Sequence, residues 1–239
     1  MSRYDDVREV LACASELIAD IKAEYDEARS NEAVGVSRVK IKHAVELIRS
    51  ALEYTAQDVW RSYTKKQNKV YFPYGKDEPQ FLASVKRSLP GVDLQAPKLY
   101  EIISGAQPHS CGDSWLFDLC MVSNFNKHNG LSRQSRKVSE SNTITLGNIA
   151  KVSGDSELTI GKCYQDGVLI SGSGPLVLSN KKGIAEAKKQ VSDGISLIQE
   201  FDWVEFHIES SDGDALKLLQ TSHVNTSRII ESIYKEISC

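Results

Sequence analysis

The residues best suited to chemistry form one short polar segment, residues 123–129. Asn124 and His128 are four positions apart, so on a helix they share one face, with Lys127 beside them. An amide and an ammonium group can stabilise negative charge on a phosphate, and an imidazole can exchange a proton near neutral pH. The alternative is an ordinary helix C-terminus, where Lys127 and His128 bind the last carbonyl groups and complement the helix dipole. Asn124, Lys127 and His128 are therefore catalytic candidates, and the capping alternative stays open.

Two basic segments are candidates for contact with nucleic acid. The first contains Arg61, Lys65, Lys66 and Lys69, beside Tyr63 and Tyr71. The second contains Arg133, Arg136 and Lys137, which follow Lys127. Cations bind phosphate groups, and aromatic rings stack on unpaired bases. The other interpretation is a solvated surface, because the chain as a whole has a net charge of -3.

No metal or cofactor site is predicted. The 5 cysteines are widely spaced, and no pair of Cys or His residues has the spacing of zinc ligands. His207 alternates with Glu205 and Glu209, a set that can hold a metal, but the solvent-facing side of an antiparallel sheet explains the alternation. We interpret the cysteines as reduced thiols, which agrees with a cytoplasmic protein.

The elements that must position these residues change character along the chain. Apolar residues recur every three or four positions over residues 5–29, 37–63, 77–89 and 114–128, which predicts helices. The second helix is expected to carry the pairs Lys42–Glu46 and Arg49–Glu53 on its exposed face. From residue 143 short β-branched runs predict antiparallel strands, with a hairpin turn at Asp166-Gly167. Residues 184–201 are a further helix candidate, 203–208 a strand, and a helix capped by Asp212 closes the chain.

The composition is that of a globular chain of one or two domains. Of the 239 residues, 41% are hydrophobic and positive and negative charges nearly balance, which excludes a disordered chain and a wholly basic nucleic-acid coat. We predict an α+β fold, with a helical bundle over residues 1–131 and a small antiparallel sheet with flanking helices over residues 143–239. This second part either folds alone or packs on the bundle. No apolar run reaches the roughly 20 residues of a membrane span, and the first residues do not resemble a signal peptide, so a cytoplasmic location is expected.

Four motifs resemble those of a group of uncharacterised bacterial and phage-encoded proteins and, more distantly, of the HEPN superfamily of helical bundles. They are Ile48-Arg49-Ser50-Ala51-Leu52-Glu53-Tyr54, Phe72-Pro73, Gln107-Pro108 and Asn124-Phe125-Asn126-Lys127-His128. The resemblance covers about residues 35 to 131. It implies a HEPN-like bundle, an RNA or protein partner and a homodimer.

HEPN ribonucleases cleave RNA without a metal ion, through an Arg, a polar residue directly after it and a His four to six positions on. Carried onto this chain, the polar residue is Asn124 and the histidine is His128, but Ser123 holds the arginine position. An arginine there would neutralise the scissile phosphate. The resemblance therefore implies a non-catalytic binding module, accessory to bacterial stress or phage defence. The alternative is a metal-independent endoribonuclease that uses His128 as acid and base and Asn124 and Lys127 to stabilise the phosphate.

Overall fold

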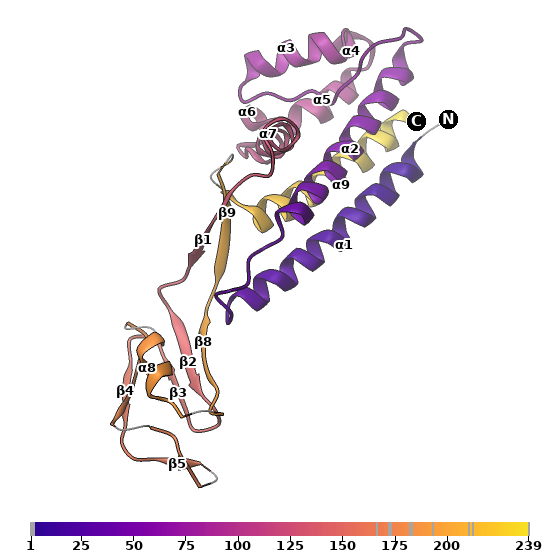
Figure 1. The fold of residues 1–239 in the computed structure, drawn as a ribbon. Helices are drawn as coiled ribbons and strands as arrows, with labels where there is room; N and C mark the ends of the chain where they lie inside the picture. Colours follow the sequence, from indigo (N-terminus) through magenta and orange to yellow (C-terminus); the bar gives the residue numbers. More distant parts are fainter. Residues whose placement is uncertain are drawn as a thin grey trace. The chain divides into compact units, whose positions relative to one another are not determined.

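The protein has a mixed α+β fold, which confirms the predicted fold class (Figure 1). The computed structural model describes residues 3–165, 167–171, 174–181, 184–192, 194–209, 211 and 213–238. The chain divides into two compact units, each made of segments that are distant in sequence. The helical unit contains residues 1–22, 37–135 and 206–239, and the β unit contains residues 23–36 and 136–205.

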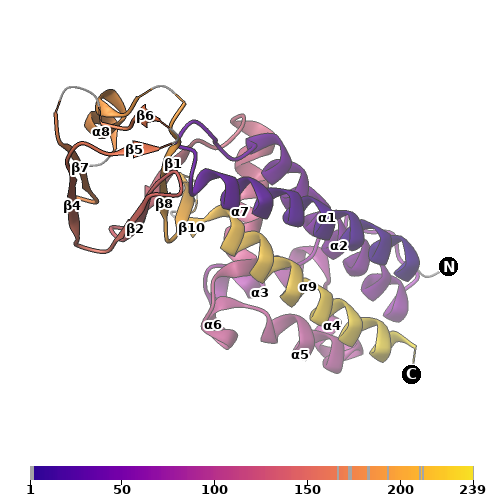
Figure 2. The ribbon, with the colours of Figure 1, turned by 90° about the horizontal axis from the view of Figure 1, so that it is seen from below.

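The helical unit is built around the first part, up to residue 22, of α1 (Tyr4–Ala28), with α2 (Arg38–Tyr63) and α9 (Ala215–Ile237). They run alongside one another in both views of the ribbon (Figures 1 and 2). Their shared core contains Val7 and Leu11 from α1, Ala51 from α2, and Ile230 and Tyr234 from α9. The C-terminal helix therefore packs on the N-terminal helices, which is one of the two arrangements expected for it.

Shorter helices complete this unit. They are α3 (Glu78–Ser88), α4 (Val92–Gln95), α5 (Pro97–Gly105), α6 (Pro108–Cys111) and α7 (Trp115–His128). α7 packs against both α2 and α9, and its residues Leu116 and Leu119 are fully buried. Packing of this kind holds the last turns of α7, where the catalytic candidates lie, at a fixed place in the unit.

N-capping side chains mark the first residues of α2 and α3. Ser37 accepts a hydrogen bond from the backbone N–H of Lys40 at 3.3 Å, and Asp77 accepts one from Gln80 at 2.9 Å. Such N-caps satisfy backbone donors that a helix leaves unpaired. At its other end α2 stops at Tyr63, because Thr64 adopts an extended conformation.

The segment after α2 is extended and packed, as the aromatic, proline and glycine residues of 70–75 predict. The backbone N–H of Phe72 donates to Glu53 Oε2 at 2.7 Å, and that of Gly75 donates to Gln107 Oε1 at 3.2 Å. The Gln107 amide in turn donates to the carbonyl of Pro73 at 3.2 Å. These bonds fix the path of the segment beside α2.

The β unit has a core of its own. A central strand β2 (Asn142–Leu146) lies between β3 (Ala150–Ser153) and β8 (Leu197–Phe201), with antiparallel pairing on both sides. Two antiparallel pairs, β4 (Glu157–Ile160) with β7 (Leu176–Ser179) and β5 (Tyr164–Gln165) with β6 (Val168–Leu169), and the short helix α8 (Ala185–Gln190) complete it. The buried residues are Ile144, Leu146, Val152, Ile170, Leu176, Leu178 and Ala187.

A further sheet has the strand order β1-β9-β10, from β1 (Gln134–Val138), β9 (Val204–Ile208) and β10 (Gly213–Asp214). β1 lies in the segment between the predicted bundle, which ends at residue 131, and the predicted sheet, which begins at residue 143. The chain passes from one unit to the other inside α1, directly before Ser37, inside β1 and inside β9. The compact units therefore do not follow the predicted ranges 1–131 and 143–239, because α9 belongs with the helices and residues 23–36 belong with the strands.

The helix predicted over residues 184–201 ends at Gln190, so the prediction is wrong beyond that residue. Gly194 has a φ of +88°, and residues 197–201 pair with β2 instead. Asp166 and Asp212 lie outside the described residues. Gly167, which follows Asp166, has a φ of 81° and lies in the turn between β5 and β6, where Gln165 pairs with Val168. Asp214, two residues after Asp212, caps α9 by accepting a hydrogen bond from the backbone N–H of Lys217 at 2.9 Å.

Among the described residues, no helix combines the length and the apolar character that a membrane crossing requires.

Candidate nucleic-acid interface

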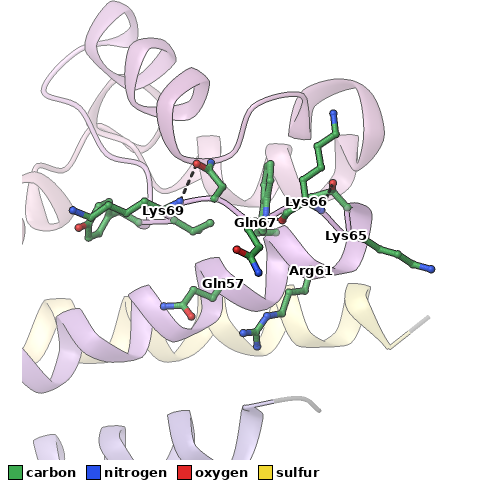
Figure 3. Close-up of a pocket in the computed structure, with 11 residues that line it drawn as sticks. Gln57, Arg61, Lys65, Lys66, Gln67 and Lys69 are labelled. Carbon is green, nitrogen blue, oxygen red and sulfur yellow. Dashed lines mark hydrogen bonds between the residues drawn. The ribbon is translucent and has the colours of Figure 1, made fainter.

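All four cations of the first basic segment line one open pocket at the C-terminal end of α2 (Figure 3). The pocket has a volume of about 810 Å³ and belongs to the helical unit. We call it the Arg61 pocket. Its lining includes Gln57, Trp60, Arg61, Lys65, Lys66, Gln67, Lys69 and Tyr71. The sequence predicted that these cations cluster, and the structure adds the concave surface on which they lie.

Hydrogen bonds to the surrounding helices hold the lysine-bearing loop in place. The indole N–H of Trp60 donates to the carbonyl of Lys66 at 2.7 Å, and the Asn68 amide donates to the carbonyl of Ser88 at 3.2 Å. Val70 is buried at the end of the loop. The loop is therefore anchored by its backbone and by apolar contacts, which leaves the lysine side chains at the surface.

The pocket carries an excess of positive charge. Arg61 Nη1 lies 3.7 Å from Asp58 Oδ1, a distance typical of a loose ion pair. Lys65 and Lys66 are exposed, and neither forms an ion pair within the described part of the chain. Lys69 Nζ lies 5.6 Å from the centroid of the Tyr71 ring. Three ammonium groups thus have no carboxylate of the described chain beside them, which favours an anionic ligand.

Asp58, the partner of Arg61, is itself tied to both ends of the chain. Its Oδ2 accepts hydrogen bonds from the backbone N–H of Arg3 at 2.8 Å and from the hydroxyl of Tyr234 at 2.9 Å. Its side chain is 7% exposed. Because these two donors already occupy Oδ2, the carboxylate holds Arg61 only through its other oxygen, and the guanidinium keeps most of its donors for a ligand.

The side chains around the pocket point in different directions. Figure 3 shows Lys65 and Lys66 extending away from the loop with their ammonium groups well separated, whereas Gln57, Arg61 and Gln67 lie together on the other side. One isolated phosphate cannot contact such divergent cations at the same time. The arrangement fits a ligand that carries several phosphates along a chain.

The three catalytic candidates lie at the C-terminal end of α7 and do not line the Arg61 pocket. Asn124, Lys127 and His128 are all exposed. The Asn124 amide donates to the hydroxyl of Tyr74 at 2.9 Å. The C-terminal carbonyls of α7 are satisfied in part by the backbone, since the N–H of Asn129 donates to Phe125 at 2.8 Å. The His128 side chain makes no hydrogen bond to the described part of the chain, and it is exposed to solvent.

Ser123, at the position where the resemblance to HEPN ribonucleases implies an arginine, faces the interior. It is 1% exposed, and its hydroxyl has no hydrogen-bond partner among the described residues. A guanidinium at this position would be inside the protein, unlike Asn124 and His128 beside it. Ser123 is therefore separated by its burial from the exposed Asn124 and His128.

A buried polar cluster beside Asn124 was missed by the sequence interpretation. Arg49, 8% exposed, lies 2.5 Å from Glu53 through its Nη2, contacts the sulfur of Cys120, and stacks 4.8 Å from the centroid of the Tyr74 ring. The Arg49–Glu53 pair was expected on the exposed face of its helix, and this expectation is wrong because α7 and the segment around Tyr74 cover it. Only the i, i+4 spacing of the pair was visible in the sequence.

Burial controls the protonation of this cluster. It raises the pKa of the Glu53 carboxyl, although Arg49 and, more weakly, Lys127 act to lower it. Burial also raises the pKa of the Cys120 thiol to about 12, again against the effect of Arg49. The thiol is therefore protonated at neutral pH and unsuited to nucleophilic chemistry.

The cations of the second basic segment are divided between the two units. Arg136 Nη2 donates to the carbonyl of Ala28 at 2.7 Å, and its guanidinium lies 5.6 Å from the centroid of the Phe201 ring, so it is used within the β unit. Lys137 is exposed in the same unit, whereas Arg133 is exposed in the helical unit. Adjacent residues of a strand also point to opposite faces, which separates Arg136 from Lys137.

Within the described parts of the chain, His, Cys, Asp and Glu residues form no group of three or more that can hold a metal ion. His207 and Glu205 are half-buried on β9.

Comparison with protein-family models, with curated proteins and with solved structures finds no match to this chain. Its function therefore has to be inferred from the sites themselves.

Proposed function

We propose that the protein is a non-catalytic binding module that holds RNA through phosphate contacts at the Arg61 pocket. The observation that carries the proposal is the gathering of Arg61, Lys65, Lys66 and Lys69 around one open pocket. The HEPN-like character of the helical unit, and an accessory role in bacterial stress or phage defence, are part of the same proposal. They rest on the four sequence motifs.

RNA is favoured over a protein partner by the chemistry that surrounds the cations. Tyr71, which lines the pocket, is 44% exposed and lies next to Lys69. Exposed aromatic rings interleaved with cations are typical of surfaces that bind nucleic acid, where the cations bind phosphates and the rings contact bases. An acidic protein segment would use the cations but would leave the ring without a specific partner.

Binding of a labelled RNA oligonucleotide, measured by fluorescence anisotropy at several salt concentrations, tests the proposal. The variant Lys65→Glu/Lys66→Glu should bind at least about tenfold more weakly. Its log affinity should also depend less steeply on log salt, by about 1.4, since each phosphate contact on a single strand contributes about 0.7.

A control separates the pocket from net charge. Lys188 and Lys189 are also adjacent and exposed, but they lie on α8 and do not line the pocket. Lys188→Glu/Lys189→Glu makes the same change in net charge and should bind RNA like the wild type. Equal weakening by both double variants would show that RNA binds through general charge, and the proposed site would be wrong.

The second candidate function is a metal-independent endoribonuclease at the end of α7. It is favoured by the exposure of Asn124, Lys127 and His128 on one helix end. In this role His128 would act as acid and base, and Asn124 and Lys127 would stabilise the phosphate. Labelled RNA incubated in EDTA should be cleaved by the wild type and not by His128→Ala; absence of cleavage by the wild type, or equal cleavage by both, rejects the enzyme.

The proposed homodimer is a separate matter of assembly. Sedimentation equilibrium on the full chain should give twice the mass of 26.5 kDa. A monomer at all concentrations would remove the dimer from the proposal without affecting the Arg61 pocket.

A further inference from the structure

We infer that the Arg61 pocket takes an unpaired nucleotide of a single strand, with its base on the Tyr71 ring and its neighbouring phosphates at the lysines. This inference rests on the proposed RNA-binding function and specifies the ligand of the same site. Four features carry it: the placement of Tyr71, the amide groups beside Arg61, the separation of the lysines and the size of the pocket.

Tyr71 is an exposed ring on an anchored backbone. Its neighbours Val70 and Phe72 are 8% and 0% exposed, whereas Tyr71 itself is 44% exposed. The two buried neighbours fix the residue between them, so the ring is held at the pocket wall before any ligand binds. A ring fixed in this way loses little conformational freedom when a base stacks on it.

The cation nearest the ring is placed for the phosphate of a stacked nucleotide. Lys69 Nζ lies 5.6 Å from the ring centroid, which is also a cation–π distance. A base that lies on a ring carries its sugar and phosphate at the edge of the stack. Lys69 lies over one face of the ring, so a base stacks on the other face, and the flexible lysine side chain can bind the phosphate at the edge of that stack.

Amide groups beside Arg61 can bind the edge of a base. Gln57 Oε1 accepts a hydrogen bond from the Arg3 guanidinium, which leaves the Gln57 NH₂ group with no partner among the described residues. Gln67 is exposed, and its side chain makes no hydrogen bond within the described chain. Both lie on the same side as Arg61 in Figure 3. Unpaired bases offer the donors and acceptors of their Watson–Crick edge to such groups, whereas paired bases do not.

The size and form of the pocket separate a single strand from a duplex. Its volume of about 810 Å³ lies within the range of about 300–1,000 Å³ that is typical of sites for small ligands, so one nucleotide can enter. In an A-form duplex the bases are stacked and paired inside the helix. A duplex would reach the lysines with its phosphates but would give no base to Tyr71, Gln57 or Gln67.

The test compares three ligands on the full-length protein at one salt concentration. They are an unstructured ten-nucleotide RNA, the same RNA annealed to its complement, and inorganic tripolyphosphate as a phosphate chain without bases. The single strand should bind at least about tenfold more tightly than the duplex. Tripolyphosphate should displace it only at concentrations far above the dissociation constant of the RNA.

Two variants at one position identify the stacking contact. Tyr71→Leu should weaken binding of the single strand by about tenfold and leave duplex binding unchanged, whereas Tyr71→Phe, which keeps the ring, should bind like the wild type. Because Tyr71 is exposed, both variants should retain the melting temperature of the wild type, which confirms that the fold is intact.

The two levels of the proposal fail in different ways. Equal affinity for the single strand and the duplex, together with wild-type binding by Tyr71→Leu, would overturn the nucleotide inference and leave the phosphate site in place. If the wild type binds no RNA, or if Lys65→Glu/Lys66→Glu binds as the wild type does, the RNA-binding function itself is wrong.

Discussion

Arg49 and Glu53 form an ion pair whose surroundings decide its effect on stability. Their side chains are 9% and 18% exposed, whereas Lys42 and Glu46, with the same i, i+4 spacing on the same helix, are 32% and 33% exposed. Removal of one partner from a buried pair leaves an uncompensated charge in the interior, whereas a surface pair contributes little. Two pairs with one sequence pattern should therefore respond differently to substitution.

Glu53→Leu is expected to lower the free energy of unfolding by about 3–5 kcal/mol, because it leaves Arg49 buried without its carboxylate. It also removes the acceptor of the Phe72 N–H. The matched substitution Glu46→Leu should cost less than about 1 kcal/mol. Urea unfolding followed by circular dichroism gives both values, and similar losses in the two variants would contradict the role of burial.

The raised pKa of Glu53 predicts that the stability of the protein depends on pH. Burial raises this pKa above its ordinary value of about 4.3, so the folded protein holds the proton more strongly than the unfolded chain does. The contribution of this proton to stability is complete below the ordinary pKa and is lost as the pH rises through the raised value.

Glu53→Gln, which cannot titrate, removes that contribution. The free energy of unfolding of the wild type minus that of Glu53→Gln should be larger at pH 4 than at pH 7. Urea unfolding of both proteins across this range measures the difference. A difference that grows as the pH rises would mean that the pKa of Glu53 is lowered in the folded protein.

At the scale of elements, the segment after α2 depends on one glycine. A Cβ atom at Gly75 would overlap the backbone nitrogen of Phe81 and would lie 2.8 Å from its Cα. These are backbone atoms of α3, so they cannot move aside as a flexible side chain can. The close approach of this segment to α3 therefore requires a residue without a side chain at position 75.

Gly75→Ala should lower the free energy of unfolding by about 1–3 kcal/mol, which is the usual cost of forcing atoms into a packed site. Gly105, in the last turn of α5, is the control, because a Cβ there would have nothing within 4 Å. Gly105→Ala should be neutral or stabilising, by up to about 1 kcal/mol. Thermal unfolding of the two variants tests the contrast, and a stable Gly75→Ala protein would show that α3 can shift.

The same scale explains which elements could be predicted from the sequence. The positions of α2 and α3 follow from local signals, namely apolar periodicity and the caps Ser37 and Asp77. β8 could not be predicted, because its pairing with β2 joins residues that are more than fifty positions apart. Long-range pairing of this kind leaves only a weak trace in a local sequence pattern.

The candidate site divides in a similar way. Its cations lie within nine residues of the chain, from Arg61 to Lys69, so their clustering was visible in the sequence. The contributions of Gln57 and Trp60 depend on how the loop after α2 folds back, and the separate buried cluster of Arg49 and Tyr74 depends on α7. These depend on tertiary packing, for which the sequence alone gave no signal.

At the scale of the whole molecule, the segments of the two units alternate along the sequence, and each unit has a hydrophobic core of its own. The core of the β unit and the core shared by α1, α2 and α9 have no residue in common. Every residue that lines the Arg61 pocket lies between positions 57 and 71, inside the helical unit. RNA binding should therefore depend on the helical core and should be insensitive to the stability of the β unit.

Leu176 and Ile230 test this separation, because they are 0% and 1% exposed and belong to different cores. Each change to alanine should cost about 2–5 kcal/mol of unfolding free energy in its own unit. Near the melting temperature of the weakened unit, Ile230→Ala should lose RNA affinity as α9 and α2 separate, whereas Leu176→Ala should bind RNA as the wild type does. Anisotropy titrations across a temperature series, with circular dichroism on the same samples, measure both properties. Parallel loss of affinity in the two variants would mean that RNA binding requires both units, and the pocket in the helical unit would then be only part of the binding surface.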